Sequence, residues 1–424
     1  MKNFFKSIVA YMLALFARAV VRRYRPRIVM ISGSVGKTST KDAVATALAV
    51  RFFVRSSDKS FNSELGVPFT ILGVKNPWGN PFAWFSVVRS ALALLVLPNH
   101  YPNMLVLEVG ADRHGDLARI LRIATPDIVV VTRLPEISVH VEAYASPEAV
   151  REEEFSPAHA LAAAAPLIIP ADDPYALDSA LRTPARSISY GVSDGATVRI
   201  DNIGFYESGG KVEGMRANMY TAGEHRSLVV KGSVGKTQLF PLAAACAAAC
   251  ALEIPLSEAL AALDTYEPPP GRGRLLQGKN DSVIIDDSYN ASPVAVEEAL
   301  STLKTFPHAK RRIAVLGDML ELGRYSVMEH ERIAALANDS ADMIVAVGIR
   351  ARAFVAAHTR AEVMLFDNAR AAALALPTLV RAGDVILVKG SQSIRTERIV
   401  EALLADPADA SRLVRQEKEW KRRL

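Results

Sequence analysis

One short stretch near the N-terminus constrains the fold of this chain most strongly. The apolar run Ile28–Ile31 precedes Ser32-Gly-Ser-Val-Gly-Lys-Thr-Ser-Thr40, and Lys41–Ala49 has a helix-forming composition. This order predicts a buried parallel strand, a glycine-bearing turn and a helix. Such a turn lets successive backbone N–H groups and the positive end of the helix face one anion. The stretch therefore predicts a phosphate-binding loop.

The chemistry of nucleotide phosphates assigns roles within this loop. We expect Lys37 to reach the terminal phosphates and the Thr38 hydroxyl to ligate a bridging Mg²⁺. The nucleotide-binding residues expected here are Gly33, Ser34, Val35, Gly36, Lys37, Thr38 and Ser39. The longer form of the motif is not met, because Ile31 stands where its first glycine would be. The alternative is a turn that merely joins a strand to a helix.

The composition excludes several classes of protein. The chain has 424 residues, 50% hydrophobic and 22% charged, which is typical of a globular protein of two or three domains. Its two cysteines, Cys246 and Cys250, predict neither a disulfide framework nor a metal site, and they fit a reducing cytoplasm. The net charge is only +5, with Lys and Arg concentrated at the two ends, so we expect no nucleic-acid partner.

Residues 1–27 contain the apolar run Ile8–Ala17 between basic side chains. This run is too short to cross a hydrocarbon core of roughly 30 Å. No small-residue cleavage site typical of a secretory signal follows it. We therefore expect a short amphipathic helix, which either lies on the inner membrane face or packs on the protein itself. The sequence does not separate these two alternatives.

Charged and polar side chains follow buried strands in the next part of the chain. Glu108 comes near the end of the strand expected over residues 104–111, and His140 and Glu142 follow the strand expected over residues 127–132. Because open α/β sheets bind ligands at the carboxyl ends of their strands, Glu108 is a candidate Mg²⁺ ligand. The largely apolar residues 76–99 are expected to form core.

The middle of the chain repeats the phosphate-loop hexapeptide. Residues 186–231 hold short alternating runs that predict a β-rich appendage. Gly232-Ser-Val-Gly-Lys-Thr237 then copies Gly33–Thr38 letter for letter. The repeat is either a second nucleotide site or a turn before an alanine-rich helix over residues 242–252. We favour the turn, as an accessory to a single site.

A second α/β unit begins at the proline run Pro268–Gly271, which we expect to form a stiff hinge. Buried strands are expected over residues 282–286, 312–316, 343–347 and 385–388. They alternate with helical segments, which predicts a Rossmann-like domain. The fold class expected is therefore α/β, with an N-terminal helix over 1–27, a P-loop ATPase-type central domain over 28–267 and a Rossmann-like domain over 268–424. The end of the chain, Arg412–Leu424, is expected to form a charged helix with a solvated basic face.

Further motifs follow the loop in a fixed order. They are Asn62-Ser-Glu-Leu-Gly-Val-Pro68, Leu107-Glu-Val-Gly-Ala111, His140-Val-Glu142, Ala171-Asp-Asp-Pro174, Pro270-Gly-Arg272, Asp286-Asp-Ser-Tyr-Asn-Ala291, Leu316-Gly-Asp-Met-Leu-Glu-Leu-Gly323 and Lys389-Gly-Ser391. With these motifs the chain, from Ile28 to about Leu404, resembles the Mur ligase family, and most closely its branch that adds D-alanyl-D-alanine to a peptidoglycan precursor.

The resemblance implies an ATP-dependent amide ligase. Such enzymes phosphorylate a substrate carboxylate to an acyl phosphate, which an amine then attacks. It implies catalytic roles for Lys37 and His140, one Mg²⁺ held by Thr38 and Glu108, and a second held by His140. We add Glu154 as a candidate catalytic residue and second ligand of that ion. Further ATP contacts would come from Gln238, Arg272 and Asp287, and substrate contacts from Asn62, Asn290, Ser292, Lys389 and Ser391. Helix capping or turn chemistry is the alternative for Ser292 and Ser391.

Two departures from the family pattern bear on the substrate and the metal. The phosphate loop follows only 27 residues of chain, so we expect the family's N-terminal UDP-sugar domain to be missing, with a partner chain as one source of it. Glu154 stands where the family has a carbamylated lysine. It either supplies a permanent carboxylate or belongs to an exposed acidic helix face beside a degraded metal site. The alternative to a ligase is an ATP-binding scaffold or regulator of the same fold.

Overall fold

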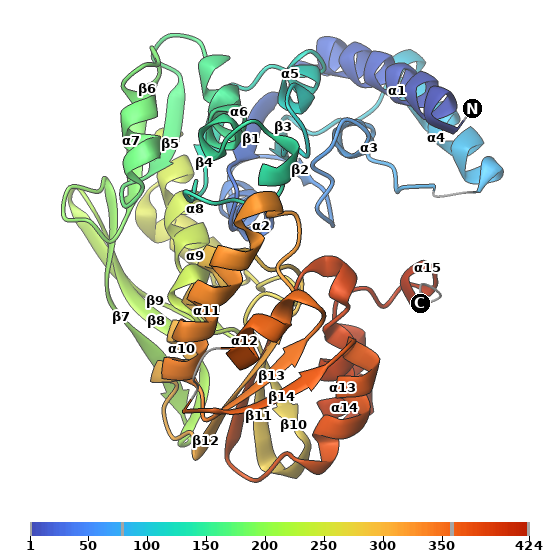
Figure 1. The fold of residues 1–424 in the computed structure, drawn as a ribbon. Coiled ribbons are helices and arrows are strands. Elements are labelled where there is room, and N and C mark those ends of the chain that lie inside the picture. The colour runs from blue at the N-terminus through green and yellow to red at the C-terminus, as the bar shows by residue number, and fades with distance from the viewer. Residues whose placement is uncertain (1, 78–79, 357–359, 422–424) are drawn as a thin grey trace.

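The computed structural model describes residues 2–77, 80–356 and 360–421, and Figure 1 shows two sheets one above the other, with helices around them. The strands are β1 (Arg27–Ser32), β2 (Val54–Ser56), β3 (Met104–Glu108), β4 (Ile128–Val131), β5 (Pro166–Pro170), β6 (Arg186–Gly191), β7 (Val198–Ser208), β8 (Lys211–Thr221), β9 (Glu224–Lys231), β10 (Arg274–Gly278), β11 (Ser282–Asp287), β12 (Arg311–Gly317), β13 (Met343–Val347), β14 (Glu362–Phe366) and β15 (Asp384–Lys389). The helices are α1 (Lys2–Tyr24), α2 (Lys37–Leu48), α3 (Gly66–Leu72), α4 (Pro81–Val96), α5 (Asp116–Leu121), α6 (Pro147–His159), α7 (Pro174–Ala180), α8 (Phe240–Ala251), α9 (Leu256–Leu263), α10 (Pro293–Thr305), α11 (Ser326–Ser340), α12 (Ala353–Ala356), α13 (Ala369–Ala375), α14 (Glu397–Leu403) and α15 (Lys418–Lys421).

The first sheet has nine strands in the order β2-β3-β1-β4-β5-β6-β7-β8-β9. Strand β1 pairs in parallel with β3 on one side and with β4 on the other. The strands that follow β1 in the chain therefore lie on opposite sides of it, which makes β1 a switch point in the strand order. In open α/β sheets such a switch point leaves a crevice at the carboxyl ends of the strands. The phosphate loop therefore begins where this sheet architecture places a ligand.

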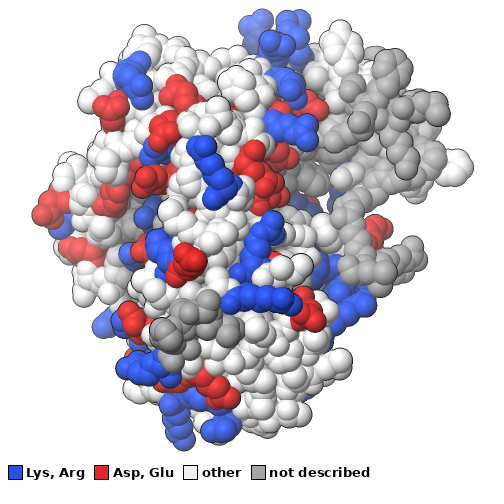
Figure 2. Space-filling model, viewed as in Figure 1, with Lys and Arg blue, Asp and Glu red and all other residues white. Residues whose placement is uncertain are grey.

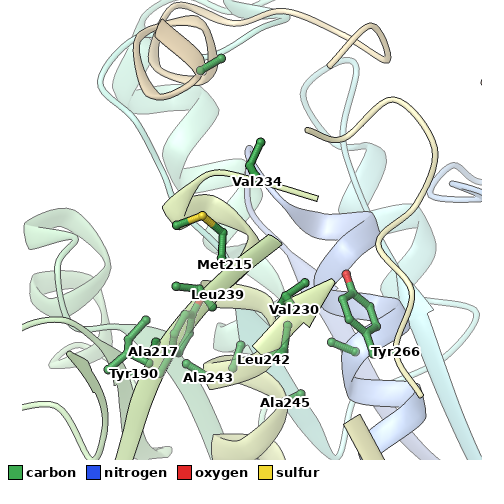
Figure 3. Packing of buried hydrophobic residues seen from close by; sticks show 14 of the residues in the cluster. Tyr190, Met215, Ala217, Val230, Val234, Leu239, Leu242, Ala243, Ala245 and Tyr266 are labelled. Atoms are coloured by element: carbon green, nitrogen blue, oxygen red, sulfur yellow. The ribbon is translucent and has the colours of Figure 1, made fainter. Parts of the chain in front are cut away.

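Alternation along β1 divides the core between the two faces of this sheet. Val29 and Ile31 belong to a cluster with α2, α8 and α9, whereas Ile28 and Met30 belong to a cluster with α1, α3, α4, α5 and α6. Figure 3 shows Met215, Ala217 and Val230 of the antiparallel strands beside Leu239, Leu242 and Ala243 at the start of α8. The small side chains of α8 let it lie close against the sheet.

The second sheet has six strands in the order β10-β11-β15-β12-β13-β14. Only β10 runs antiparallel to its neighbour, and helices cover both faces, which is a Rossmann-like arrangement. The cluster under α8 continues through α10 and α11 onto one face of this second sheet. A shared core thus joins the two sheets on both sides of residues 268–271.

The α/β fold class is confirmed, and several local expectations are wrong. Strands β5, β10 and β14 were not expected. Of the core expected over residues 76–99, Trp78 and Gly79 lie outside the described residues, and the described part forms core on one face of α4 only, because Phe82, Phe85 and Val96 are exposed. Among its described residues the segment Arg412–Leu424 is α-helical only over Lys418–Lys421, and Arg415 is buried in an ion pair with Glu397 rather than solvated.

The N-terminal helix packs on the protein. Leu13, Ala17 and Val20 of α1 are buried in the cluster shared with α3 and α4. The Tyr24 hydroxyl donates to Leu94 O at 2.8 Å, and the Tyr24 ring stacks on Tyr101 with ring centroids 4.4 Å apart. Among the described residues no helix is both long and apolar enough to cross a membrane.

Candidate functional site

The phosphate loop has the turn and the helix that its sequence predicts, but the amides of Ser34 and Val35 donate to Arg133 O at 3.0 and 3.3 Å instead of pointing freely at a ligand. Gly33 takes φ 107°, and a Cβ there would lie 2.4 Å from Thr132 Oγ1, so only glycine fits beside β4. Gly36 takes φ 89° and is the N-cap of α2, where no side chain caps the helix. The first N–H groups of α2 are therefore left for a ligand, and an anion suits them best.

Lys37 reaches back over the loop to a buried carboxylate. Its Nζ donates to Gly33 O and lies 3.4 Å from Glu154 Oε1. Glu154 Oε2 in turn accepts from the Gly33 amide at 3.3 Å. Helix α6 positions this carboxylate, since it packs beside β1 and Ser32 Oγ donates to Glu154 O. The structure thus brings Lys37 and Glu154 together at one point of the loop.

Glu154 is not part of an exposed acidic face. Glu153 and Glu154 are both buried, and Glu153 accepts hydrogen bonds from the amides of Gly115 and Leu117. Burial raises the pKa of Glu154, and the charge of Lys37 with the amides of Ala111 and Gly33 opposes this rise. The alternative of an exposed acidic helix face is therefore wrong for these two residues, and only Glu152 of the acidic run is exposed.

The residues at the end of β3 fit a Mg²⁺ ion. Glu108 Oε1 accepts from Thr38 Oγ1 at 3.2 Å and from Ser60 Oγ, whereas Glu108 Oε2 is buried without a hydrogen-bond partner. A buried carboxylate oxygen without a partner is costly unless a cation completes it. Magnesium at nucleotide sites needs only one or two carboxylates, since phosphates and waters supply the rest. Thr38 and Glu108 are therefore suitable ligands.

His140 contacts the second half of the chain. Its Nδ1 lies 2.8 Å from Glu321 Oε2, and its Nε2 lies 3.7 Å from Asp112 Oδ1. Burial lowers the pKa of His140, but the hydrogen bond and charge of Glu321 and the charge of Asp112 outweigh it, so the pKa is raised overall. Among the described residues no cluster of three His, Cys, Asp or Glu side chains is assembled for a metal. A second Mg²⁺ on His140 and Glu154 stays a prediction.

Arg272 links the second half of the chain to the loop. Its Nη2 donates to Thr38 Oγ1 at 3.4 Å, and its guanidinium lies over the Tyr289 ring, 4.2 Å from the centroid. Arg272 Nε is buried without a partner. A fixed guanidinium with a free donor beside a phosphate loop is suited to hold a phosphate oxygen.

The ends of β11 and β15 add a further charged pair. Asp287 and Lys389 face each other in register, and Lys389 Nζ lies 2.6 Å from Asp287 Oδ2. Lys389 also donates to Asn290 O at 3.0 Å, and Asn290 Oδ1 accepts from the Gln392 amide at 3.3 Å. These residues hold one another at the edge of the second sheet that faces the loop.

A cavity of about 110 Å³ joins the two halves. Its lining contains ten of the predicted residues, namely Ser34, Val35, Gly36, Ser39, Gln238, Arg272, Asp287, Asn290, Ser292 and Lys389. Gln238 is buried there with an unpartnered Oε1. The residues predicted from widely separated motifs therefore lie around one space.

A neighbouring cavity of about 210 Å³ was not predicted. It shares Val35, Gly36 and Thr237 with the first and adds Pro170, Asp172, Tyr190, Phe240 and Pro241. An apolar cavity with an aromatic wall beside a phosphate loop has the character of a site for a nucleobase. The signal available in the sequence was the Ala171–Pro174 motif, which precedes this wall.

A third cavity opens on the other side of Thr38. It measures about 810 Å³ and is lined by Thr38, Ser60, Phe61, Trp84, Arg272, Tyr289 and Arg415, among others. It is large enough for a substrate of several residues, and Thr38 and Arg272 lie between it and the loop. A group bound there would meet a phosphate bound on the loop.

The repeated hexapeptide serves the same site rather than a second one. Val234 N donates to Gly273 O at 2.8 Å, and Ser233 Oγ donates to Arg272 O at 2.8 Å, so this turn holds the segment that carries Arg272. Lys236 pairs with Glu298 at 3.1 Å and is half exposed. The turn also contributes Thr237 and Gln238 to the shared cavity.

Three predicted substrate residues have different surroundings. The Asn62 amide nitrogen lies beside Gly110, next to the end of the Lys37 side chain. Ser292 lines the shared cavity and forms no side-chain cap on α10. Ser391 Oγ accepts from the Leu320 amide at 2.9 Å, which is the turn chemistry considered as its alternative.

Comparison with known families matches both halves of the chain. The model described as "Mur ligase middle domain" matches residues 31–249, and the model described as "Mur ligase, glutamate ligase domain" matches residues 271–392. The first match contains the phosphate loop with Glu108, His140 and Glu154, and the second contains Arg272, Asp287 and Lys389. Both halves of the site therefore lie within matched regions.

Individual relatives are similar over most of this chain. The UDP-N-acetylmuramoyl-tripeptide--D-alanyl-D-alanine ligase of Mycobacterium bovis is 32% identical over 410 residues, covering 89% of this chain and 73% of that protein. The protein of the same name from Bacillus subtilis is 25% identical over 397 residues, covering 92% and 79%. The crystal structure of the MurF ligase from Thermotoga maritima in complex with ADP has a TM-score of 0.75 and 25% identity, over 93% of this chain and 83% of that one.

Proposed function

The chain belongs to the Mur ligase family, and from this premise we propose that it joins a peptide carboxylate of a peptidoglycan precursor to an amine at the expense of ATP. The relatives are named for adding D-alanyl-D-alanine to a UDP-N-acetylmuramoyl tripeptide, and we assign the same pair of substrates to this chain. The observation that carries the proposal is the position of Thr38 and Arg272, between the phosphate loop and the cavity of about 810 Å³.

The first step is transfer of the terminal phosphoryl group of ATP. A carboxylate oxygen of the peptide attacks the γ-phosphorus, the bond from this phosphorus to the β,γ-bridging oxygen breaks, and ADP leaves. Such a transfer depends on positioning and charge neutralisation more than on covalent help. Lys37 and the N–H groups at the start of α2 hold the phosphates, and Arg272 neutralises charge from the other side.

The second step forms the amide. The amine nitrogen attacks the carbonyl carbon of the acyl phosphate, the bond from that carbon to the phosphate oxygen breaks, and inorganic phosphate leaves while the nitrogen loses a proton. Asn290 and Lys389 would hold the amine substrate, because they lie at the edge of the second sheet facing the loop. Asp287, expected above to contact ATP, pairs with Lys389 at the same edge. Ser292 lies beside them.

Mg²⁺ belongs to this proposal, with Thr38 and Glu108 as the residues that would hold it. The ion would neutralise phosphate charge during transfer. Glu154 would then act as a fixed carboxylate on the far side of Lys37, keeping the ammonium group oriented toward the loop. The cavity bounded by Tyr190 and Phe240 would receive the adenine ring.

We also propose where in the cell the reaction takes place. Cys246 and Cys250 are both free thiols, in agreement with a reducing cytoplasm. We assign the chain to the cytoplasm, with contact to the inner membrane face.

The experiment uses the purified chain with ATP and Mg²⁺. Product formation is followed by mass spectrometry with the UDP-linked muramoyl tripeptide and D-alanyl-D-alanine, together and singly. We expect ADP release that depends on both substrates and a new amide of the combined mass. An ATP-binding scaffold of the same fold would bind nucleotide and give neither product.

A further inference from the structure

Helix α1 has two apolar faces. One face is buried against α3 and α4 through Leu13, Ala17 and Val20. The other presents Ile8, Tyr11, Met12 and Leu15 to solvent, with Tyr11 66% exposed. These positions recur at helical spacing and continue into Arg18 and Arg22. A helix buried on one side only would ordinarily be polar on the other, so the outer apolar stripe needs a separate explanation.

Helix α4 repeats this arrangement. Val87, Ala91 and Leu94 are buried, whereas Phe82, Phe85, Leu92 and Val96 form an exposed stripe on the opposite side. Phe82 is 87% exposed and Phe85 is 72% exposed, although each could bury a full aromatic ring. Arg89 lies in the middle of this stripe and is exposed as well.

The two stripes belong to one surface. Helices α1 and α4 contact each other, and Arg23 at the end of α1 donates to Leu97 O just beyond α4 at 3.3 Å. Both bury their inner faces in the same core cluster, so their outer faces point away from the same layer. Figure 1 shows them side by side at the outer edge of the molecule, away from the second sheet.

The charge of this surface has one sign. The sequences of α1 and α4 contain no Asp or Glu, and the charged residues whose side chains are described there are Arg18, Arg22, Arg23 and Arg89. Elsewhere, on the face shown in Figure 2, the described basic side chains are interspersed with acidic ones. An apolar surface whose charges are all basic is complementary to a layer that is apolar inside and negatively charged outside.

We propose that the outer faces of α1 and α4 form a docking surface for the headgroup region of an anionic lipid bilayer. Phe82, Phe85, Tyr11 and Met12 enter the boundary between headgroups and acyl chains, and Arg18, Arg22 and Arg89 pair with lipid phosphates. A second copy of this chain fits less well, because self-association through this surface would bring arginines of the same sign together. The inference extends the location assigned above and does not depend on the ligase reaction.

The test is sedimentation of the full chain with lipid vesicles. Vesicles of phosphatidylcholine with phosphatidylglycerol should bind the protein, vesicles of phosphatidylcholine alone should bind it weakly, and high salt should weaken the anionic binding. The double variant F82S/F85S should raise the lipid concentration for half-binding by about tenfold or more. R18Q/R22Q should remove the preference for anionic lipid.

Matched controls separate this surface from general stickiness. Leu181 and Leu374 are 86% and 83% exposed elsewhere on the molecule, so L181S/L374S removes similar apolar area and should leave vesicle binding unchanged. Equal binding of the parent and F82S/F85S to anionic vesicles would overturn the proposal. So would a parent that ignores vesicles but forms a dimer, in analytical ultracentrifugation, that F82S/F85S abolishes.

Discussion

Lys37 Nζ lies 3.4 Å from Glu154 Oε1, so the lysine of the phosphate loop is paired with a carboxylate buried beneath it. The pair explains how a buried acid is tolerated, because an unpaired buried charge would be far more costly. It also fixes the lysine head at the point where phosphates would bind. The two residues come from α2 and α6, which β1 brings together.

Replacement of Glu154 by glutamine tests this arrangement. E154Q keeps the size and loses the charge, so we expect ATP turnover with both substrates to fall by about a hundredfold or more, since a preorganised electrostatic group is removed. E152Q, on the same helix but exposed, is the control and should keep the parent rate. A parent-like rate in E154Q, measured by steady-state ADP release, would show that the carboxylate has no part in the reaction.

The repeated hexapeptide offers a matched pair of lysine variants. K37M removes the ammonium group from the loop on β1 and should lower kcat by about a hundredfold or more. K236M makes the identical change in the identical hexapeptide, where the half-exposed lysine lines the cavity proposed for adenine and pairs with Glu298. We expect K236M to change the KM for ATP by no more than about threefold, as for a partly exposed ion pair. Similar losses of kcat in both variants would contradict the assignment of a single nucleotide site.

The strand-and-loop core of the site could be predicted from sequence because its signals are local. Ile28–Thr40 carries its own hydrophobic run, glycines and phosphate chemistry, and Glu108 follows a buried strand directly. The Rossmann-like half was read from four buried strands in the same way. Strand β14 is not predicted because Glu362–Phe366 is an edge strand with no buried residue. Strand β10 is not predicted because it is an antiparallel edge strand.

Burial decided the points that sequence patterns left open. The acidic run Glu152–Glu154 reads as a solvated face, yet two of its carboxylates point inward to accept backbone amides and to pair with Lys37. Likewise Arg415 lies in a basic run but is buried between Glu397 and Tyr289. Such pairings join residues far apart in the chain, and a single sequence carries no signal of them. The cavity wall formed by Tyr190 and Phe240 could not be predicted from the sequence for the same reason.

The ion pair between His140 and Glu321 predicts a pH response. Because the folded-state pKa of His140 is raised above its ordinary value of 6.5, the pair contributes stability below that pH and loses it as the pH rises through the folded-state pKa. E321Q should lower the pKa of His140, as measured by NMR titration of the imidazole. D112N should lower it less, because Asp112 lies 3.7 Å away rather than 2.8 Å. An unchanged pKa in E321Q would contradict the pairing.

Asp286 predicts a second pH dependence, which arises from burial of the carboxyl rather than from an ion pair. Burial raises the pKa of this carboxyl from 3.8 to about 6, although hydrogen bonds from Ser288 oppose the rise. The folded state therefore binds its proton more tightly, and the resulting stability is present below about pH 4 and is lost as the pH rises through about 6. The loss amounts to roughly 3 kcal/mol. D286N cannot ionise and should lack this loss in urea unfolding series at several pH values. If the free energy of unfolding changed with pH in the same way in the parent and in D286N, this role of Asp286 would be excluded.

The most direct measurement follows the oxygen atoms of the donor carboxylate. The peptide donor is labelled with ¹⁸O in its reacting carboxylate and incubated with the parent chain, ATP, Mg²⁺ and D-alanyl-D-alanine. Because a carboxylate oxygen attacks the γ-phosphorus and leaves with it, the account predicts one ¹⁸O in each inorganic phosphate released, in step with the amide formed. Unlabelled phosphate released without amide would contradict the account, since water would then be the acceptor of the phosphoryl group.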